Sequence, residues 1–215
     1  ELERDELADF PVVTLDATFP VADGPDGLRT AVERLADEAE AAVRAGTDIL
    51  VLDDGRMRIT AIETNHAPVK PAYAYRFDYR GRSVVVTGDT TAWAPLVEAS
   101  RGADVLVSEA MNREMVATLQ KVTGEAGRPR VSHIMHDIQS YHVSPTEAAT
   151  MANAAGVKLL VLYHLLPAPD NAALRTVFTR GVGEVRKGRW DLSRDGSLYS
   201  LPVGSTDVLV GRVAY

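Results

Sequence analysis

The stretch VVVTGDT at residues 84–90 decides how this chain is understood, because it joins a strand-forming run to a turn. Successive valines favour a buried β-strand, and the Gly88-Asp89 pair that follows them favours a turn. Two interpretations of Asp89 stay open at this point. The residue belongs to an ordinary turn, or the strand holds its carboxylate rigidly at the edge of a sheet, where it can serve as a ligand of a metal ion.

Composition indicates a globular protein in which a metal site would use nitrogen and oxygen ligands only. The chain has 215 residues, of which 46% are hydrophobic and 25% charged, enough for one domain or two small ones with a real core. It contains no cysteine, which excludes disulfides, thiolate metal sites and cysteine nucleophiles. Histidine, aspartate and glutamate are therefore the strong metal ligands available.

Charge and hydropathy limit the partners that we expect. A formal net charge of -7 and a pI near 5.3 do not favour nucleic acid as a partner, whereas an acidic balance suits divalent cations. No apolar run approaches the roughly 20 residues that a membrane span requires, and the charged start ELERDELADF is unlike a signal peptide. We therefore expect a cytoplasmic protein that makes no contact with a membrane.

The first 54 residues are predicted to form a βαβ unit with a parallel pair of strands. PVVTLDATF at 11–19 is expected to be extended, and DILVLDD at 48–54 is a short buried strand. Between them, apolar residues recur at helical spacing and Gly46 follows as a C-cap would. The helical stripe consists of Leu28, Ala31, Val32, Leu35, Ala39, Ala42 and Val43.

Strands follow in close succession from Gly55 and then alternate with helices. Ser144-Pro145-Thr146-Glu147 is a capping box with proline at the first helical position, so a helix is expected to begin there and to end at Gly156. Near the C-terminus, a hairpin is predicted around Asp195-Gly196. The predicted strands lie in 57–66, 72–89 with a turn at 79–82, 103–110, 157–164 and 207–215.

Polar side chains stand at the predicted ends of several apolar strands. Asp89, Glu109 and His164 each end one strand, and His66 ends another. Ends of neighbouring strands meet at one edge of an α/β sheet, where such folds place their sites. Asp89 and His164 could therefore share a metal ion although they are far apart in sequence. The alternative is that each is a hydrogen-bonded structural residue.

The segment HIMHDIQSYH at 133–142 holds the other three histidines. His133 and His136 could bind a metal as an i, i+3 pair on a helix, but the segment could equally be a loop, and its one nearby carboxylate is Asp137. His142 precedes a predicted helix start, where an imidazole can act as a general acid or base near neutral pH. Glu109 would orient it if the two residues meet in space.

Residues 55–203 resemble the C-terminal half of metallo-β-lactamase-fold hydrolases, in particular the ribonuclease Z-like branch. The resemblance implies an α/β fold of the αββα type, in which Asp89 bridges two metal ions and His164 completes the shell of one of them. It also implies that Glu109 and His142 form a pair that assists proton transfer to the leaving group. The matching pieces are NHAPVKPAYAYRFDYRGRSVVVTGDT, GADVLVSEAM, HDIQSYHVSPTEAA, AGVKLLVLYHLLP and SRDGSLYSLP.

The N-terminal part departs from that family. Such hydrolases hold most of their metal through an HxHxDH loop and a further histidine, whereas this chain has no such motif and no histidine before His66. Residues 1–54 instead resemble a piece of the central region of the glutamate synthase large subunit, without its glutaminase, flavin or iron–sulfur residues. We therefore predict two regions, 1–54 and 55–215, in which a βαβ unit replaces the usual N-terminal half, as in a natural or engineered chimera.

Three functions are compatible with these features. The first is a metal-dependent hydrolase of a phosphodiester or another ester or amide, with His142 and Glu109 as catalytic residues and Asp89, His164 and His66 as ligands of zinc or manganese. Its metal centre would be incomplete and its activity low. The second is a non-catalytic scaffold or interaction protein with the same half-fold, and the third is glutamate synthase-derived chemistry, which has little support. A homo-oligomer is also compatible with the sequence, which leaves the oligomeric state open.

Overall fold

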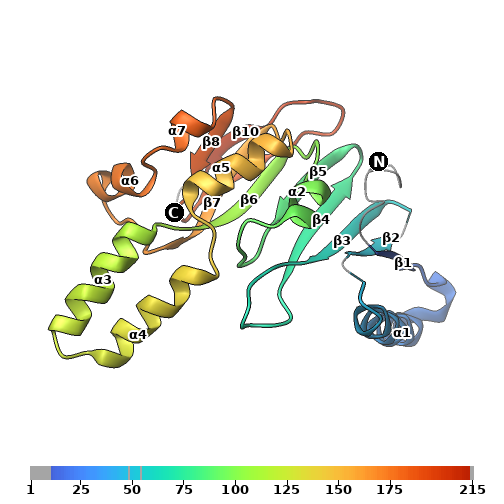
Figure 1. Cartoon of the computed structure of the whole chain (residues 1–215). Coiled ribbons are helices and arrows are strands. Elements are labelled where there is room, and N and C mark those ends of the chain that lie inside the picture. Colours follow the sequence, from blue (N-terminus) through green and yellow to red (C-terminus); the bar gives the residue numbers. More distant parts are fainter. Residues whose placement is uncertain (1–10, 48, 54, 214–215) are drawn as a thin grey trace.

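We analysed a computed structural model, which describes residues 11–47, 49–53 and 55–213. Most of the described strands form one mixed sheet of 8 strands, which lie side by side in their order along the chain (Figure 1). The α/β class predicted from the sequence is therefore confirmed. The strands of this sheet are β1 (Val12–Asp16), β2 (Ile49–Asp53), β3 (Met57–Glu63), β4 (Tyr73–Tyr79), β5 (Arg82–Val86), β6 (Val105–Met111), β7 (Leu159–Leu166) and β8 (Arg189–Leu192).

Strand direction divides the sheet into three stretches. β1 and β2 are parallel, joined by the helix α1 (Gly24–Arg44), so the predicted βαβ unit is present. β2 to β5 are antiparallel to one another. β5 to β8 are parallel, as the helical crossovers between them require. The carboxyl ends of β5, β6 and β7 consequently lie at one edge of the sheet.

One face of the sheet carries the main core. Ile49, Ile62 and Ala74 lie side by side on β2, β3 and β4 and are fully buried. Helices cover this face and contribute Leu96 and Ala149 to the same cluster. The covering helices are α2 (Ala94–Ala99), α5 (Pro145–Ala154), α6 (Ala172–Phe178) and α7 (Val182–Val185).

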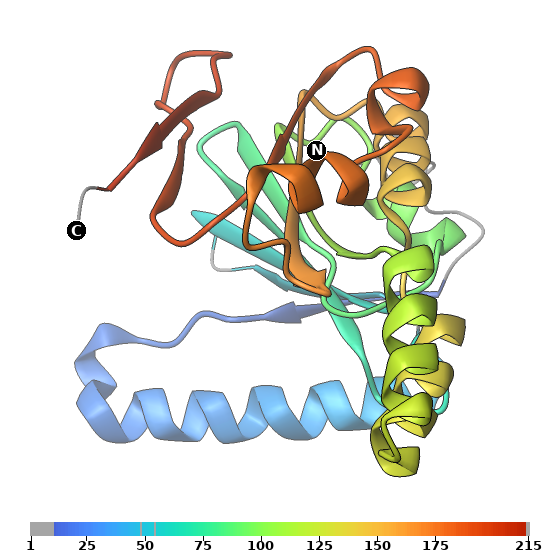
Figure 2. The same cartoon turned by 90° about the vertical axis from the view of Figure 1, so that its left-hand side faces the viewer.

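The opposite face has a smaller cover at its C-terminal strands. β9 (Ser197–Ser200) and β10 (Leu209–Arg212) form an antiparallel pair, and Tyr199 packs over Val105 and Val161 of β6 and β7. Figure 2 shows this pair on one side of the sheet and the helices α2 and α5 on the other. The predicted hairpin around Asp195-Gly196 is wrong, because β8 pairs with β7 and β9 with β10.

A pair of helices projects from the body of the molecule between β6 and α5 (Figure 1). These are α3 (Arg113–Glu125) and α4 (Pro129–Asp137), which pack on each other as one arm. Short 3-10 turns, Val21–Asp23 and Ile138–Ser140, complete the described helical elements. Within the described ranges, no helix has the length and apolar character needed to cross a bilayer.

Candidate functional site

The turn after β5 presents Asp89 through a glycine that no other residue can replace without movement. Gly88 has a φ of +58°, and a Cβ on it would lie 2.6 Å from the backbone oxygen of Tyr73. A side chain would therefore meet both a disfavoured conformation and a fixed backbone atom. Thr87 anchors the other side of the turn, since its N–H donates to Val107 on the neighbouring strand over 3.0 Å. The Val-rich strand thus ends in a rigid turn.

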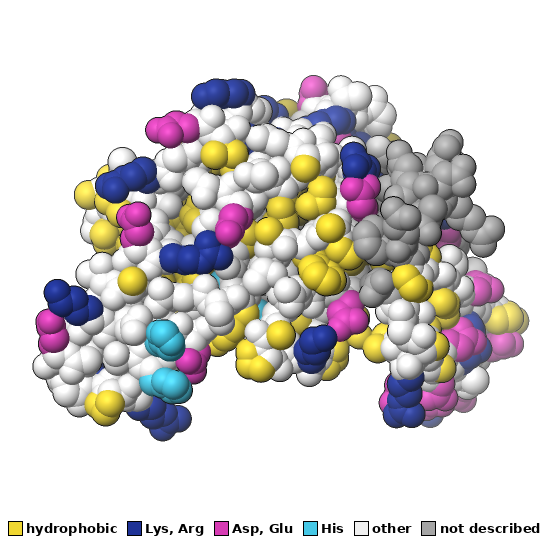
Figure 3. Space-filling model, in the orientation of Figure 1, with side chains coloured by type: hydrophobic (Ala, Val, Ile, Leu, Met, Phe, Trp, Pro, Cys, Tyr) yellow, Lys and Arg dark blue, Asp and Glu magenta, His cyan; other side chains and the backbone are white. Residues whose placement is uncertain are grey.

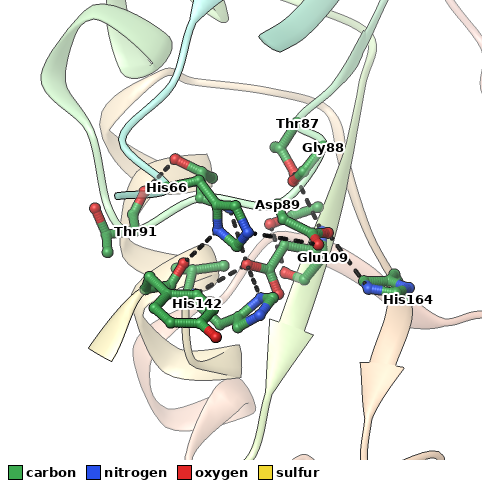
Figure 4. A network of polar contacts seen from close by, with 12 residues as sticks. His66, Thr87, Gly88, Asp89, Thr91, Glu109, His142 and His164 are labelled. Carbon is green, nitrogen blue, oxygen red and sulfur yellow. Dashed lines mark hydrogen bonds and ion pairs between the residues drawn. The ribbon is translucent and has the colours of Figure 1, made fainter. Parts of the chain in front are cut away.

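Asp89 lies between two histidines that come from distant strands. Its Oδ1 is 3.4 Å from Nε2 of His164, and its Oδ2 is 4.0 Å from Nε2 of His66. Figure 4 shows the two imidazoles on either side of this carboxylate. The expected proximity of Asp89 and His164 is therefore found, and each oxygen of the carboxylate faces a different ring nitrogen.

His164 reaches the site through an irregularity in β7. Glu109 pairs with Tyr163 and Ala110 pairs with Leu165, so His164 is an extra residue without a partner in β6. Its φ of +42° is left-handed, which is uncommon for any residue other than glycine. A bulge of this kind re-aims one side chain next to a site. The prediction that β6 and β7 end at Glu109 and His164 is thus wrong, because both strands continue beyond them.

His66 is held by a hydrogen bond that fixes the tautomer of its neutral ring. Its Nδ1 lies 2.9 Å from the backbone oxygen of Tyr141. A carbonyl can only accept, so Nδ1 carries the proton, and Nε2 of the neutral ring keeps a lone pair. That Nε2 is the atom that faces Asp89. This arrangement is the one by which proteins orient a histidine that binds a metal.

His142 is held in the same way, by a carboxylate. Its Nδ1 lies 3.0 Å from Oε1 of Glu109, and both side chains are buried. The carboxylate accepts the Nδ1 proton, which leaves Nε2 of the neutral ring free. The expected meeting of Glu109 and His142 is thus present, and one ligand atom each of His66, Asp89 and His142 lie within 4.8 Å of one another.

Glu109 is the fully buried acid at the centre of this network. Its Oε1 also accepts the N–H groups of Thr90 and Val143, each over 3.1 Å. Its Oε2 is buried and has no hydrogen-bond partner among the residues that the structure describes. A buried acceptor without a donor is costly, and such atoms are found where a site handles a ligand or a proton.

The polar environment also affects Tyr163, which sequence reasoning did not single out. Burial, and then the nearby carboxylate of Asp89, raises the pKa of the Tyr163 hydroxyl. Tyr141 was missed as well, because its role rests on a backbone carbonyl, which carries no signal in the sequence.

The other two histidines lie outside this network. α4 is a helix, so His133 and His136 are an i, i+3 pair, but His133 is exposed and faces Asp137 at 3.2 Å. His136 contacts Gln120 instead, with 3.5 Å between the two nitrogens. Neither belongs to a group of three potential ligands among the described residues. Figure 3 shows histidine side chains at the surface of the α3–α4 arm.

Comparison with protein families matches most of the chain. The family model described as "Beta-lactamase superfamily domain" matches residues 5–165. The curated "Ribonuclease Z" of Mycobacterium avium is 38% identical over 126 residues, which are 59% of this chain and 41% of that protein. The "Putative ribonuclease Z" of Mycobacterium tuberculosis is 36% identical over 116 residues, 54% of this chain and 47% of that protein. The chain thus matches less than half the length of these relatives.

Solved structures with a similar chain trace include a metallo-β-lactamase-fold protein and a tRNase Z. The metallo-β-lactamase-fold protein YhfI from Bacillus subtilis is 25% identical, covers 67% of this chain and 50% of that chain, and gives a TM-score of 0.46. The short form of human tRNase Z is 22% identical, covers 54% of this chain and 43% of that chain, and gives a TM-score of 0.40.

Proposed function

The chain belongs to the β-lactamase superfamily, and we propose that it is a metal-dependent hydrolase whose site lies at the carboxyl ends of β5, β6 and β7. The substrate class proposed is a phosphodiester, with another ester or an amide as the alternative, because the curated relatives carry the name ribonuclease Z. The proposal includes a cytoplasmic location. The resemblance of residues 1–54 to glutamate synthase stays a prediction, as does the division at residue 54.

The observation that carries this proposal is the convergence of imidazole nitrogens on one carboxylate. The His66 ring has Nδ1 committed to an acceptor, so its Nε2 lone pair is available on the side that faces Asp89. Nitrogen and carboxylate oxygen are ligands that zinc accepts, and the residues present therefore fit such an ion. His66, Asp89 and His164 would hold it. When bound there, a divalent ion would act as a Lewis acid that polarises the scissile group and activates water near neutral pH.

The proton-transfer role is proposed for His142. Its Nε2 is free while Glu109 holds Nδ1, so the ring can accept or donate a proton at Nε2 without turning. Glu109 stabilises the imidazolium that forms when Nε2 is protonated. The ring centroid of His142 is 5.0 Å from that of His66, which places the acid directly beside the proposed ligands. In the alternative arrangement the ligands would be His66, Asp89 and His142, because one ligand atom of each lies within 4.8 Å of the others.

The proposed centre is incomplete and weakly active. The chain lacks the HxHxDH motif, and catalytic zinc ordinarily has about three protein ligands in a tetrahedral arrangement. His66, Asp89 and His164 can serve one ion in this way but are too few for two. Because the His164 side chain is half-exposed, we expect this one ion to be bound weakly, with less than one tightly held ion per chain.

Metal content and turnover test the proposal together. Elemental analysis after dialysis against a mild chelator gives the number of retained ions, and a chromogenic phosphodiester with added zinc or manganese gives the activity. We expect low turnover that Asp89→Ala abolishes and that His133→Ala, a histidine outside the site, leaves unchanged. Two tightly retained ions would contradict the incomplete centre. If the folded protein shows no metal binding and no turnover, the alternative of a non-catalytic scaffold is favoured.

A further inference from the structure

Arg113 connects the α3–α4 arm to the loop that carries His142. It is the first residue of α3 and follows closely on the end of β6. Both ends of the arm join the body of the molecule beside the start of α5 (Figure 1). The Arg113 side chain is 39% exposed, and its guanidinium is directed at that loop. The arm and the loop are therefore in direct contact next to the site.

Each of the three guanidinium nitrogens of Arg113 has its own acceptor. Nη2 donates to the backbone oxygen of His142 over 2.8 Å, and Nε donates to that of Gln139 over 3.3 Å. Nη1 forms an ion pair with Oε2 of Glu147 at 2.9 Å. The acceptors belong to a 3-10 turn, to the loop and to the first turn of α5. One planar group thus holds both ends and the middle of the segment around His142.

The carbonyl of His142 depends on this guanidinium. No other hydrogen bond to this oxygen is found within the ranges that the structure describes. His142 is only 4% exposed. Without Arg113, the carbonyl of a buried residue would lack its donor, which is costly unless the loop shifts or water enters. Either change would move the backbone from which the His142 ring extends.

Glu109 and Arg113 hold opposite ends of the same residue. Glu109 accepts the Nδ1 proton of the His142 ring, whereas Arg113 holds the carbonyl. The ring turns about single bonds to its backbone, so a hydrogen bond at Nδ1 directs Nε2 only while the backbone stays in place. The carbonyl contact supplies this restraint at the backbone.

We propose that Arg113 is a positioning residue for His142, whose fork of donors keeps Nε2 of the imidazole directed at the leaving group. This inference rests on the proton-transfer role proposed above for His142. Arginine suits the task because its rigid fork serves several acceptors at once, whereas the lysine ammonium is a compact charge on a flexible stem. Loss of the fork should therefore impair the reaction step that needs a proton, and other steps much less.

The first measurement requires neither metal nor turnover. NMR observes the Nδ1 proton of His142, which the Glu109 carboxylate should shift downfield and protect from exchange with water. His142→Ala assigns the signal by removing it. Arg113→Met removes all three hydrogen bonds, so loss of the signal through faster exchange is expected. Arg113→Lys keeps the charge without the fork and should restore the signal only in part.

Arg186→Met is the matched control. The Arg186 guanidinium also donates to three acceptors, but these lie near the amino ends of β7 and β8, at the other edge of the sheet from the site. The acceptors are the backbone oxygens of Arg189 and Val157 and Oδ1 of Asn153. Arg186 is also more buried than Arg113. Its loss therefore reports the effect of general loosening, and the His142 signal should persist.

The second measurement compares two esters in the protein supplied with zinc or manganese. Arg113→Met should lower kcat by about 10-fold for an ester with a basic alkoxide leaving group, the lower end of what loss of an orienting residue costs. A nitrophenolate leaves without a proton, so kcat for a nitrophenyl ester should change little. KM is expected to stay near the wild-type value for both esters.

The outcomes separate this inference from the hydrolase function. Loss of the signal in Arg113→Met, with its retention in Arg186→Met and selective slowing of the alkoxide ester, supports the proposal. A folded wild type with the signal but no turnover contradicts the hydrolase function, and the positioning of the ring is then decided by the NMR alone. An unchanged signal in Arg113→Met overturns the proposal, as does loss of the signal in both variants. Equal slowing of both esters, or full recovery in Arg113→Lys, also overturns it.

Discussion

The backbone N–H of Thr90 donates to Oε1 of Glu109 over 3.1 Å, and the same oxygen faces Nδ1 of His142. One buried carboxylate thus ties the turn that presents Asp89 to the loop that presents His142. Glu109 therefore holds both sides of the site at once.

The first prediction compares Glu109→Ala with Glu109→Gln. Glutamine keeps a side-chain oxygen that can accept the backbone N–H groups that Oε1 of Glu109 accepts. Alanine has no such oxygen, so it releases both loops. We expect Glu109→Ala to weaken zinc binding by about 10- to 100-fold, the usual cost of losing a residue that orients ligands, and Glu109→Gln to weaken it less. Competition with a chromogenic chelator measures the affinity. Asp104→Asn, which disturbs a buried network away from the site, controls for loss of stability. Equal weakening by both substitutions would show that loop anchoring is unimportant.

The second prediction concerns the leaving group. If His142 donates a proton to it, His142→Ala should lower turnover by about 10²- to 10⁴-fold for a substrate with a basic alkoxide leaving group. A nitrophenolate leaves without protonation, so turnover of a nitrophenyl ester should change much less. Zinc affinity is expected to stay near that of the wild type. A large loss of affinity, with both substrates slowed alike, would identify His142 as a metal ligand instead.

The third prediction concerns the buried ion pair between Asp104 and Arg82. Burial alone would raise the pKa of this carboxyl, but hydrogen bonds from Lys158, the Ser83 N–H and Arg82 outweigh it and hold the pKa below its usual value. A lowered pKa stabilises the fold above the ordinary carboxyl pKa of about 4, and this contribution is lost as pH falls through the folded-state value. Asp104→Asn should therefore cost about 3 kcal/mol near neutral pH.

The difference between wild type and Asp104→Asn should disappear in acid, below the folded-state pKa. Urea unfolding at neutral and at acid pH measures it. Glu98→Gln is the control, because its partner Arg101 is half-exposed and such surface pairs contribute at most about 1 kcal/mol. A difference that persisted unchanged into strong acid would contradict this role of Asp104.

The fourth prediction concerns the start of α5. Ser144 accepts the N–H of Glu147, and the Glu147 carboxylate accepts the N–H of Ser144, which completes the capping box. Ser144→Ala should lower the free energy of unfolding by about 1 kcal/mol. Thr150→Ala on the same helix is the control, since its exposed hydroxyl only contacts the carbonyl of Thr146 in the preceding turn. Thermal unfolding compares the two, and equal effects would count against the cap.

Sequence patterns predicted the elements that depend on local chemistry. The apolar runs identified β5, β6 and β7, and the capping box identified the start of α5 at Pro145. The turn at residues 79–82 follows from Arg80 and Gly81, both of which have positive φ as a tight hairpin requires. These signals lie within a few residues of one another, so no knowledge of tertiary packing is needed to read them.

Other features depend on contacts that the sequence does not encode locally. β9 pairs with β10, and Arg82 of β5 holds the segment that connects them by donating to the backbone oxygens of Pro202 and Asp207. That long-range contact cannot be read from the turn at Asp195-Gly196. The contacts that anchor His66 and Asp89 could not be predicted for the same reason. They use the backbone carbonyl of Tyr141 and the backbone N–H of Thr90, and nearly every residue has such groups whatever its side chain.

The left-handed backbone of His164 lowers the stability of the fold at a position whose imidazole we propose as a metal ligand. A non-glycine residue with this conformation costs on the order of 1 kcal/mol, and the bulge leaves it without a pairing partner. A library of residues at position 164 sorted for folding alone should consequently enrich glycine and asparagine. The same library sorted for metal binding should return histidine. Disagreement between the two selections would show that the imidazole at position 164 serves the site at a cost in folding stability.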